Sequence, residues 1–266
     1  MKLKLPCPIG LGHILAVPPE CARPRAQRPP QAVRSRNVLA CRTGRRLLRP
    51  GTGALRISFF VLASLAVLAG CAGPTNLYVH KQALIRYHDS GQYDAEVRRV
   101  ANRAMNYIRQ RAASGQPNLA VVLDIDDTSI STWARLVQDD FANKRELFIG
   151  WANTHTDPAI VPILDLYRES RRLGVKVFFV TGRRTALAER TRAALAAAGY
   201  TDPDGFYFRP ESDREKSLAP FKTGARREIT RQGFCIIANL GDQASDLAGG
   251  YAERAFKIPN PFYYTP

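Results

Sequence analysis

The chain has 266 residues, 45% of them hydrophobic, which is enough for one medium α/β domain with a full core. Its formal charge of +16 would suit a nucleic-acid partner, but residues 1–70 hold 12 Lys and Arg against one acid, Glu20. That segment carries +11 and the remaining residues only +5, which removes the main support for nucleic-acid binding.

Residues 1–70 are predicted to be a basic leader that ends in a signal peptide. Ile57–Ala69 is an uncharged apolar run of 13 residues behind Arg49 and Arg56. A bilayer span needs about 20 such residues, whereas the hydrophobic region of a signal peptide needs only about 7–15. The run leads into Leu68-Ala69-Gly70-Cys71, which resembles the lipobox at which bacterial lipoproteins are lipidated and cleaved.

Cys71 is therefore predicted to carry a lipid and to begin the mature chain, with residues 71–78 as a tether. A plain signal peptide, or a buried helix that ends in Gly-Cys, is the alternative. Ala72 is not an acidic retention signal, so we expect a bacterial cell-envelope protein anchored in the outer membrane and facing the periplasm. Residues 1–44 are rich in Pro and Arg and are either a disordered extension or the product of a start codon placed too early; we favour the second.

Helices and strands alternate along the rest of the chain. Residues 79–113 are predicted to be helical with a break at Ser90-Gly91, and Leu119–Leu123 has the β-branched centre of a buried parallel strand. Further helices are expected at 159–173, 185–198, 222–232 and 243–248. Further strands are expected at 175–180, 206–208, 234–240 and 255–258. This order predicts an α/β fold with a Rossmann-like parallel sheet and helices on both faces, which binds ligands at the carboxyl ends of its strands.

Carboxylates follow the first and the fourth predicted strands. Asp124 and Asp126 leave the first strand, and Asp242 and Asp246 leave the fourth. Carboxylates at the end of a buried strand are costly to desolvate unless a cation compensates them, although a solvated acidic loop would show the same residues. Hard oxygen ligands gathered in this way suit Mg²⁺ rather than zinc.

The second predicted strand ends in Thr181-Gly182-Arg183. A hydroxyl, a glycine that permits close backbone approach and a cation can together cradle an oxyanion, but they also suit an ordinary turn from strand to helix. A lysine is still needed to offset the charge of the carboxylates and of a bound phosphate. Lys216 and Lys222 are the candidates between these strands.

The order of the motifs, DxDxT, TGR, Lys and GDxxxD, resembles the haloacid dehalogenase (HAD) superfamily over residues 92–264. Within it, the chain is most similar to the plant-type acid phosphatases and vegetative storage proteins, which are related to the bacterial class C lipoprotein acid phosphatases. The stretches that carry this resemblance are Ser90–Tyr93, Asp124–Ser129, Phe221–Thr223, Asn239–Leu247 and Phe256–Tyr264. The resemblance implies a phosphatase domain at 79–266.

The resemblance also implies the catalytic roles. Asp124 would attack phosphorus to form an aspartyl-phosphate, and Asp126 would act as general acid and then as general base. Thr181 and Gly182, together with Lys222, would bind the phosphoryl oxygens and neutralise the charge that builds in the transition state. Lys222 is preferred to Lys216 because Phe-Lys-Thr followed by a helix fits the family pattern, and Arg183 is expected to support the phosphate site or the sheet.

The cofactor implied by the resemblance is Mg²⁺. Asp124, the backbone carbonyl of Asp126 and Asp242 would bind it, and Asp246 would orient the shell directly or through water. Residues 129–156, between the first two motifs, would form a small, mainly helical cap. Trp133 and Trp151 of this cap would either stack on a nucleoside or aryl group or pack the cap onto the core.

The expected function is hydrolysis of small phosphomonoesters, such as nucleotides or aryl phosphates, by a membrane-anchored enzyme without a nucleic-acid partner. A specific 5′-nucleotidase is the alternative if Trp133 or Trp151 lines the pocket. A catalytically silent storage or binding lipoprotein of the same fold is the second alternative. Because Asp124, Asp126 and both late acids are present, the sequence favours activity.

Overall fold

The computed structural model describes residues 76–215 and 217–266. The predicted signal peptide, Cys71 and Lys216 lie outside these residues, so the lipid anchor stays a prediction. Within the described ranges, none of the helices combines the length and apolar character that a membrane span requires. Helix α2 spans Leu77–Asp89. Its residues up to Arg86 belong to one compact unit, and Tyr87–Pro266, which include the sheet, belong to another.

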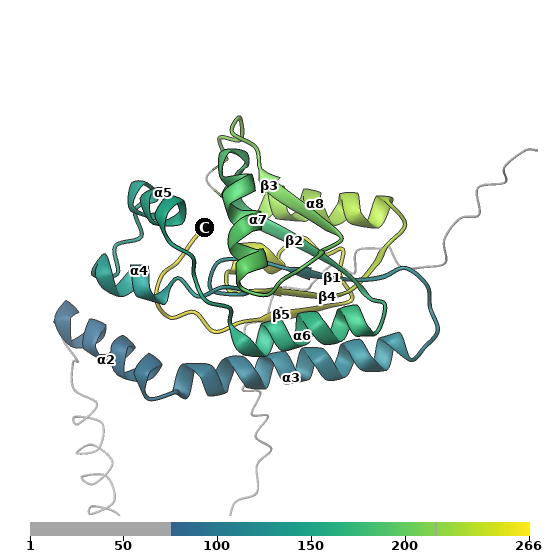
Figure 1. Cartoon of the computed structure of the whole chain (residues 1–266), viewed down its shortest axis with the longest axis horizontal. Coiled ribbons are helices and arrows are strands. Elements are labelled where there is room, and N and C mark those ends of the chain that lie inside the picture. Colours follow the sequence, from purple (N-terminus) through teal and green to yellow (C-terminus); the bar gives the residue numbers. More distant parts are fainter. Residues whose placement is uncertain (1–75, 216) are drawn as a thin grey trace, which may run out of the picture. The chain divides into compact units, whose positions relative to one another are not determined.

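Five parallel strands in the described part of the chain form one sheet in the order β3-β2-β1-β4-β5 (Figure 1). Their bounds are Leu119–Leu123 for β1, Lys176–Arg184 for β2, Gly205–Arg209 for β3, Cys235–Gly241 for β4 and Arg254–Lys257 for β5. The central strand β1 is buried along its whole length, as its apolar sequence predicts. The predicted parallel α/β architecture is confirmed.

The helices follow the predicted alternation. They are α3 (Gln92–Ala112), α6 (Val161–Arg172), the short η1 (Thr185–Leu187), α7 (Ala188–Ala197), α8 (Ala219–Arg231) and α9 (Ala244–Leu247). The insert between the first two motifs carries α4 (Trp133–Gln138) and α5 (Arg145–Thr154), so it is mainly helical, as expected. The break at Ser90-Gly91 separates α2 from α3, and Gly91 has a φ of 78°, which side chains disfavour.

Side chains that alternate along the strands fill both faces of the sheet. On one face, β1, β2 and β4 pack against α8 through Ala120, Val122, Phe178, Val180, Ile236, Ala225 and Ile229. On the other face, Phe179 of β2 stacks with Tyr167 of α6 and meets Tyr200 edge-on. Helices thus cover the two faces, and the carboxyl ends of the strands are left for a ligand site.

The strand order reverses direction at β1. The chain passes from β1 outward to β2 and β3 and then crosses the sheet through α8 to β4 on the other side of β1. In open α/β sheets, ligands bind at the carboxyl ends beside such a switch point. The loop after β1 and the loop after β4 meet there, and α4 and α5 lie at the same end of the sheet (Figure 1).

Candidate active site

Asp124 is the first residue after β1 and is buried at the switch point. Its backbone N–H donates to the carbonyl of Leu240 at 3.0 Å, which continues the pairing of β1 with β4. Its own carbonyl accepts the hydroxyl of Ser129 at 2.6 Å, so the loop after β1 is closed back onto this residue. The backbone of the expected nucleophile is therefore held by the sheet and by its own loop.

Lys222 reaches this carboxylate from α8. Its Nζ donates to Asp124 Oδ1 at 2.5 Å and also to Asp246 Oδ1. All three side chains are buried. Burial works to lower the pKa of Lys222, but the carboxylates of Asp124 and Asp246 outweigh it and raise the pKa, so the ammonium stays charged. The structure thus brings together the lysine and the first aspartate that the sequence selected.

Asp124, Asp242 and Asp246 form a buried acidic cluster. One carboxylate oxygen from each lies within 4.8 Å of the other two. Burial, followed by repulsion from neighbouring carboxylates, raises the pKa of Asp124 well above its usual range, against the effect of Lys222. The pKa of Asp242 is raised by burial and by Asp246. One ammonium does not balance three carboxylates, and hard oxygen donors at this spacing fit a divalent cation such as Mg²⁺.

Hydrogen bonds orient the carboxylate of Asp242. Its Oδ2 accepts the side-chain amides of Gln243 and Asn260, both at 2.6 Å, and its Oδ1 accepts the hydroxyl of Thr128 at 3.2 Å. Such partners fix the direction in which a carboxylate presents its free lone pairs to a metal. Asn260 belongs to the segment after β5. In the sequence, only the family resemblance connects this segment with the site.

The short helix α9, which carries Asp246, packs tightly against the end of β4. Asp246 Oδ2 accepts the backbone N–H of Gln243 at 2.7 Å and caps the short helix α9. Its carbonyl accepts the amide of Asn239 at 2.9 Å and the guanidinium of buried Arg226 at 2.5 Å. A Cβ on Gly241 would lie 2.3 Å from Asp246 Cβ, so only glycine fits at this position.

Asp126 lies apart from the acidic cluster and is held by Arg183. The guanidinium donates to Asp126 Oδ1 from Nη2 at 2.6 Å and to Oδ2 from Nε at 3.1 Å, a forked ion pair. Asp126 is 21% exposed and lines the pocket, whereas Arg183 is buried. The side chain of Asp126 thus lies in the pocket outside the acidic cluster, and Arg183 fixes its position.

The other two residues expected to bind phosphate, Gly182 and Thr181, have different surroundings. Gly182 lines the pocket, and a Cβ there would lie 2.8 Å from Leu218 Cδ1. Thr181 is fully buried, and its hydroxyl accepts the backbone N–H of Arg183 at 3.1 Å. In this arrangement the Thr181 side chain stabilises the last residues of β2, where the pairing with β3 shifts register, and Gly182 is the residue of the pair that meets the pocket.

Asp127, the third acid of the loop after β1, supports the site through its hydrogen bonds. It is buried at a φ of 51° and accepts the Thr132 hydroxyl at 2.5 Å, the Thr132 N–H at 2.9 Å and the Tyr263 hydroxyl at 2.9 Å. Burial and the charge of Asp242 raise its pKa to about 7. Asp127 thus ties the loop after β1 to the start of the cap and to the segment after β5.

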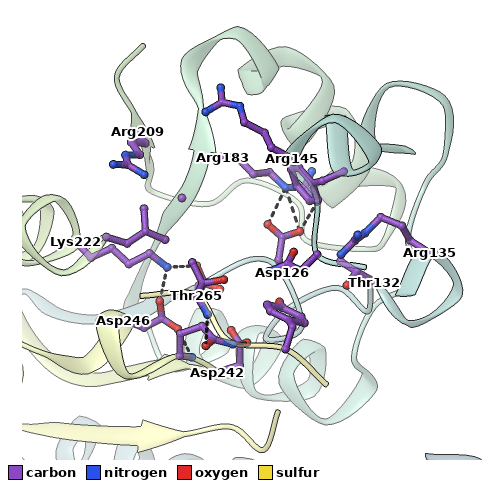
Figure 2. Close-up of a pocket in the computed structure, with 17 residues that line it drawn as sticks. Asp126, Thr132, Arg135, Arg145, Arg183, Arg209, Lys222, Asp242, Asp246 and Thr265 are labelled. Atoms are coloured by element: carbon purple, nitrogen blue, oxygen red, sulfur yellow. Dashed lines mark hydrogen bonds and ion pairs between the residues drawn. The ribbon is translucent and has the colours of Figure 1, made fainter. Parts of the chain in front are cut away.

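The pocket has a volume of about 300 Å³ and is shared by the sheet, the cap and the last residues of the chain. Its lining consists of Asp124, Asp126, Thr132, Arg135, Asn143, Arg145, Phe148, Gly182, Arg183, Arg209, Leu218, Lys222, Asp242, Gln243, Asp246, Tyr263 and Thr265. Figure 2 shows Lys222 close to Asp246 and Asp242, Asp126 beside Arg183, and Arg209 on the same side of the pocket as Lys222. Sequence reasoning gave no role to Arg135, Arg145, Arg209, Tyr263 and Thr265. Tyr263 lies in the stretch Phe256–Tyr264 that carries the resemblance, and the other four lie outside every motif.

The two tryptophans of the cap do not line this pocket. Trp133 stacks on His88 with ring centroids 3.8 Å apart, and Trp151 stacks on His155 at 3.7 Å. The indole of Trp151 also donates to Asp157 at 2.8 Å. The expectation that either ring stacks on substrate finds no support in this geometry. The aromatic residue of the cap that does line the pocket is Phe148.

Comparisons with known proteins identify the family of the chain. Residues 75–266 match the family model of the acid phosphatases of HAD superfamily subfamily IIIB. Acid phosphatase 1 of Solanum lycopersicum is 33% identical over 181 residues, which cover 65% of this chain and 69% of that protein. The stem 28 kDa glycoprotein of Glycine max is 30% identical over 200 residues, which cover 73% of this chain and 74% of that protein.

A solved structure supports the fold independently. The class C acid phosphatase from Bacillus anthracis superposes with a TM-score of 0.57 over 69% of this chain and 86% of its own, at 21% identity. At that identity the likeness speaks for the fold alone. Taken with the match over residues 75–266, it means that the chain belongs to the acid phosphatases of the HAD superfamily, subfamily IIIB, a family of phosphomonoester hydrolases.

Proposed function

We propose that this protein is a Mg²⁺-dependent phosphomonoesterase that works through an aspartyl-phosphate on Asp124. The observation that carries the proposal is the buried arrangement of Lys222 between Asp124 and Asp246, with Asp242 completing the cluster. A buried carboxylate beside a fixed ammonium suits attack on phosphorus, because the ammonium of Lys222 is already in place to bind the oxygens of the phosphate. Because Asp126 stands beside it and is held separately, proton transfer is assigned to a second residue.

The two half-reactions use these two aspartates. In the first, Asp124 Oδ forms a bond to phosphorus while the bond from phosphorus to the ester oxygen breaks, and protonated Asp126 donates its proton to the departing oxygen. In the second, Asp126 accepts a proton from water as that water attacks phosphorus. The bond from phosphorus to Asp124 then breaks and inorganic phosphate leaves. Arg183 keeps Asp126 in one position through both steps.

The acidic cluster would hold the metal. Asp124, Asp242 and Asp246 offer three buried oxygens, and the carbonyl of Asp126 is the further ligand that the resemblance implies. When bound, Mg²⁺ would supply positive charge to the phosphoryl oxygens. Lys222 adds the ammonium from α8, and its fixed ion pairs mean that it needs no rearrangement when charge develops on phosphate.

The substrates we propose are small phosphomonoesters, in keeping with a pocket of about 300 Å³ that has Phe148 at its cap side. The place of action we propose is a bacterial cell envelope, with the protein held by a lipid on Cys71. This location depends on the sequence of the leader alone. Recovery of the protein in the membrane fraction, lost in Cys71→Ser, would support it, and an unchanged distribution would contradict it.

The central test is hydrolysis of 4-nitrophenyl phosphate by the full-length protein between pH 4 and 9, with Mg²⁺ or with EDTA. We expect turnover that needs Mg²⁺ and that falls by at least about 10³-fold in Asp124→Asn, because the amide cannot form the covalent intermediate. A folded Asp124→Asn protein with wild-type turnover would contradict the assignment of the nucleophile. Full turnover in EDTA would contradict the metal.

A further inference from the structure

One arginine of the cap, Arg135, is buried without hydrogen bonds for part of its charge. It lies on α4 and is 2% exposed. Its Nε and Nη1 atoms are buried and form no hydrogen bond within the described part of the chain. Asp139 lies 3.5 Å from Nη1, too far for a good hydrogen bond, and its own Oδ2 is likewise buried without a partner. Leaving donors of a buried guanidinium unpaired is costly, so a ligand that satisfied them would recover free energy.

Arg135 also lines the active-site pocket, next to Phe148 of α5. Its guanidinium carbon lies 5.6 Å from the centre of the Phe148 ring, and that of Arg183 lies 5.2 Å from the same ring. The charge of Arg183 is met by the carboxylate of Asp126. Arg135 has no comparable partner in the described part of the chain, although it faces the same ring.

A second cation without a close hydrogen-bonded acid shares this side of the pocket. Arg145, on α5, is exposed, lines the pocket and forms no ion pair with residues of the described ranges. The other cations in the lining are matched: Lys222 by Asp124 and Asp246, and Arg209 by Asp213 at 2.9 Å. The two lining cations that lack a close hydrogen-bonded acid, Arg135 and Arg145, therefore both belong to the cap.

Arg135 and Arg145 lie where the leaving group of a bound ester would extend, away from the place of the transferred phosphate. Lys222 and the acidic cluster mark the place of the transferred group, and Asp126 must face the ester oxygen in order to protonate it. Figure 2 shows Arg135 and Arg145 on the far side of Asp126 from Asp242 and Asp246. A leaving group that extends past Asp126 would run along Phe148 toward the two arginines.

We propose that Arg135 and Arg145 form a second anion subsite, which selects phosphomonoesters whose leaving group carries a carboxylate or a second phosphate. The proposal rests on the proposed function, since it concerns the leaving-group side of the same pocket. It explains why a guanidinium with unpaired donors is kept at the pocket wall. Forked arginine donors match the geometry of carboxylate and phosphate oxygens.

The test uses pairs of esters that differ in the second anion and little in shape. The full-length protein with Mg²⁺ is given 3- and 4-carboxyphenyl phosphate and the neutral 3- and 4-carbamoylphenyl phosphates, and kcat/KM is measured for each. We expect at least one carboxyl ester to exceed its carbamoyl partner by about tenfold, the size of one charge-assisted hydrogen bond. Arg145→Gln and Arg135→Gln should each lower this preference, measured as the ratio of kcat/KM for the carboxyl ester to that for its carbamoyl partner, to within about twofold of one.

Arg103→Gln is the matched control, because Arg103 is exposed on α3 and its loss removes the same charge away from the pocket. It should retain the preference. Arg145 is exposed, so its variant keeps the test valid even if Arg135→Gln does not fold. No preference in the wild type, or a preference unchanged in Arg145→Gln, would overturn the subsite while leaving the phosphatase intact. Hydrolysis of none of the four esters would overturn the proposed function and the subsite with it.

Discussion

Asp124 and Asp126 are two residues apart in sequence, yet their surroundings differ. Asp124 is buried against Lys222, whereas Asp126 is partly exposed and paired with Arg183. A carboxylate fixed beside an ammonium suits attack on phosphorus, and one at the pocket surface can exchange protons with solvent and with a leaving group. The division of labour that we propose for the two residues thus follows from their neighbours.

The role of Asp126 gives a prediction at the level of this residue. Asp126→Asn should lower kcat/KM by about 10²–10⁴-fold for an alkyl phosphate, whose leaving oxygen must be protonated, and much less for 4-nitrophenyl phosphate. The measurement is kcat/KM for both esters in the wild type and the variant. An equal loss on the two substrates would show that Asp126 acts through structure and not through proton transfer.

Residue types at the ends of the predicted strands point to Asp124, Asp126, Asp242 and Asp246, and the family resemblance selects Lys222 over Lys216. The physical basis is that parallel strands bring their carboxyl ends to one edge, where buried charged groups are costly without a partner. Arg135 and Tyr263 could not be found in this way. Each reaches the site through tertiary packing, from a short cap helix and from the segment after β5, and neither has a local pattern that distinguishes it.

Among the elements, β1 has the bounds that its apolar run predicts, while α8 begins at Ala219, three residues before the predicted start. The difference has a local cause. Pro220 occupies the first turn, where its missing N–H costs nothing, and the helical periodicity becomes visible only after it. The predicted helix at 185–198 is divided into η1 and α7, since a tight turn follows β2.

The end of β4 and the start of α9 give a prediction at the level of these elements. Gly241→Ala should lower the free energy of unfolding by about 1–3 kcal/mol and strongly reduce activity, because its Cβ would collide with Asp246. Gly224→Ala, inside α8 with no atom within 4 Å of its Cβ, should instead raise the free energy of unfolding by about 0.5–1 kcal/mol. Urea unfolding and aryl phosphatase assays on both variants check this contrast. Equal stability of the two would contradict the packing at Gly241.

At the scale of the whole molecule, the metal site that we propose would link folding to metal binding. Three buried carboxylates share one ammonium, so the folded state gains from a cation that the unfolded chain does not bind. Mg²⁺ at about 100 times its Kd should raise the free energy of unfolding by about 2.7 kcal/mol. Urea unfolding with Mg²⁺ or EDTA measures this, and Asp124→Asn should lose most of the increase. An equal increase in that variant would place the metal elsewhere.

The segment 260–266 completes a site that begins more than a hundred residues earlier in the chain. Asn260 holds Asp242, Tyr263 holds Asp127, and the backbone N–H of Thr265 donates to Gln243 at 3.1 Å. A chain cut before Asn260 would therefore keep all the strands of the sheet and lose the hydrogen bonds that hold Asp242, Asp127 and Gln243.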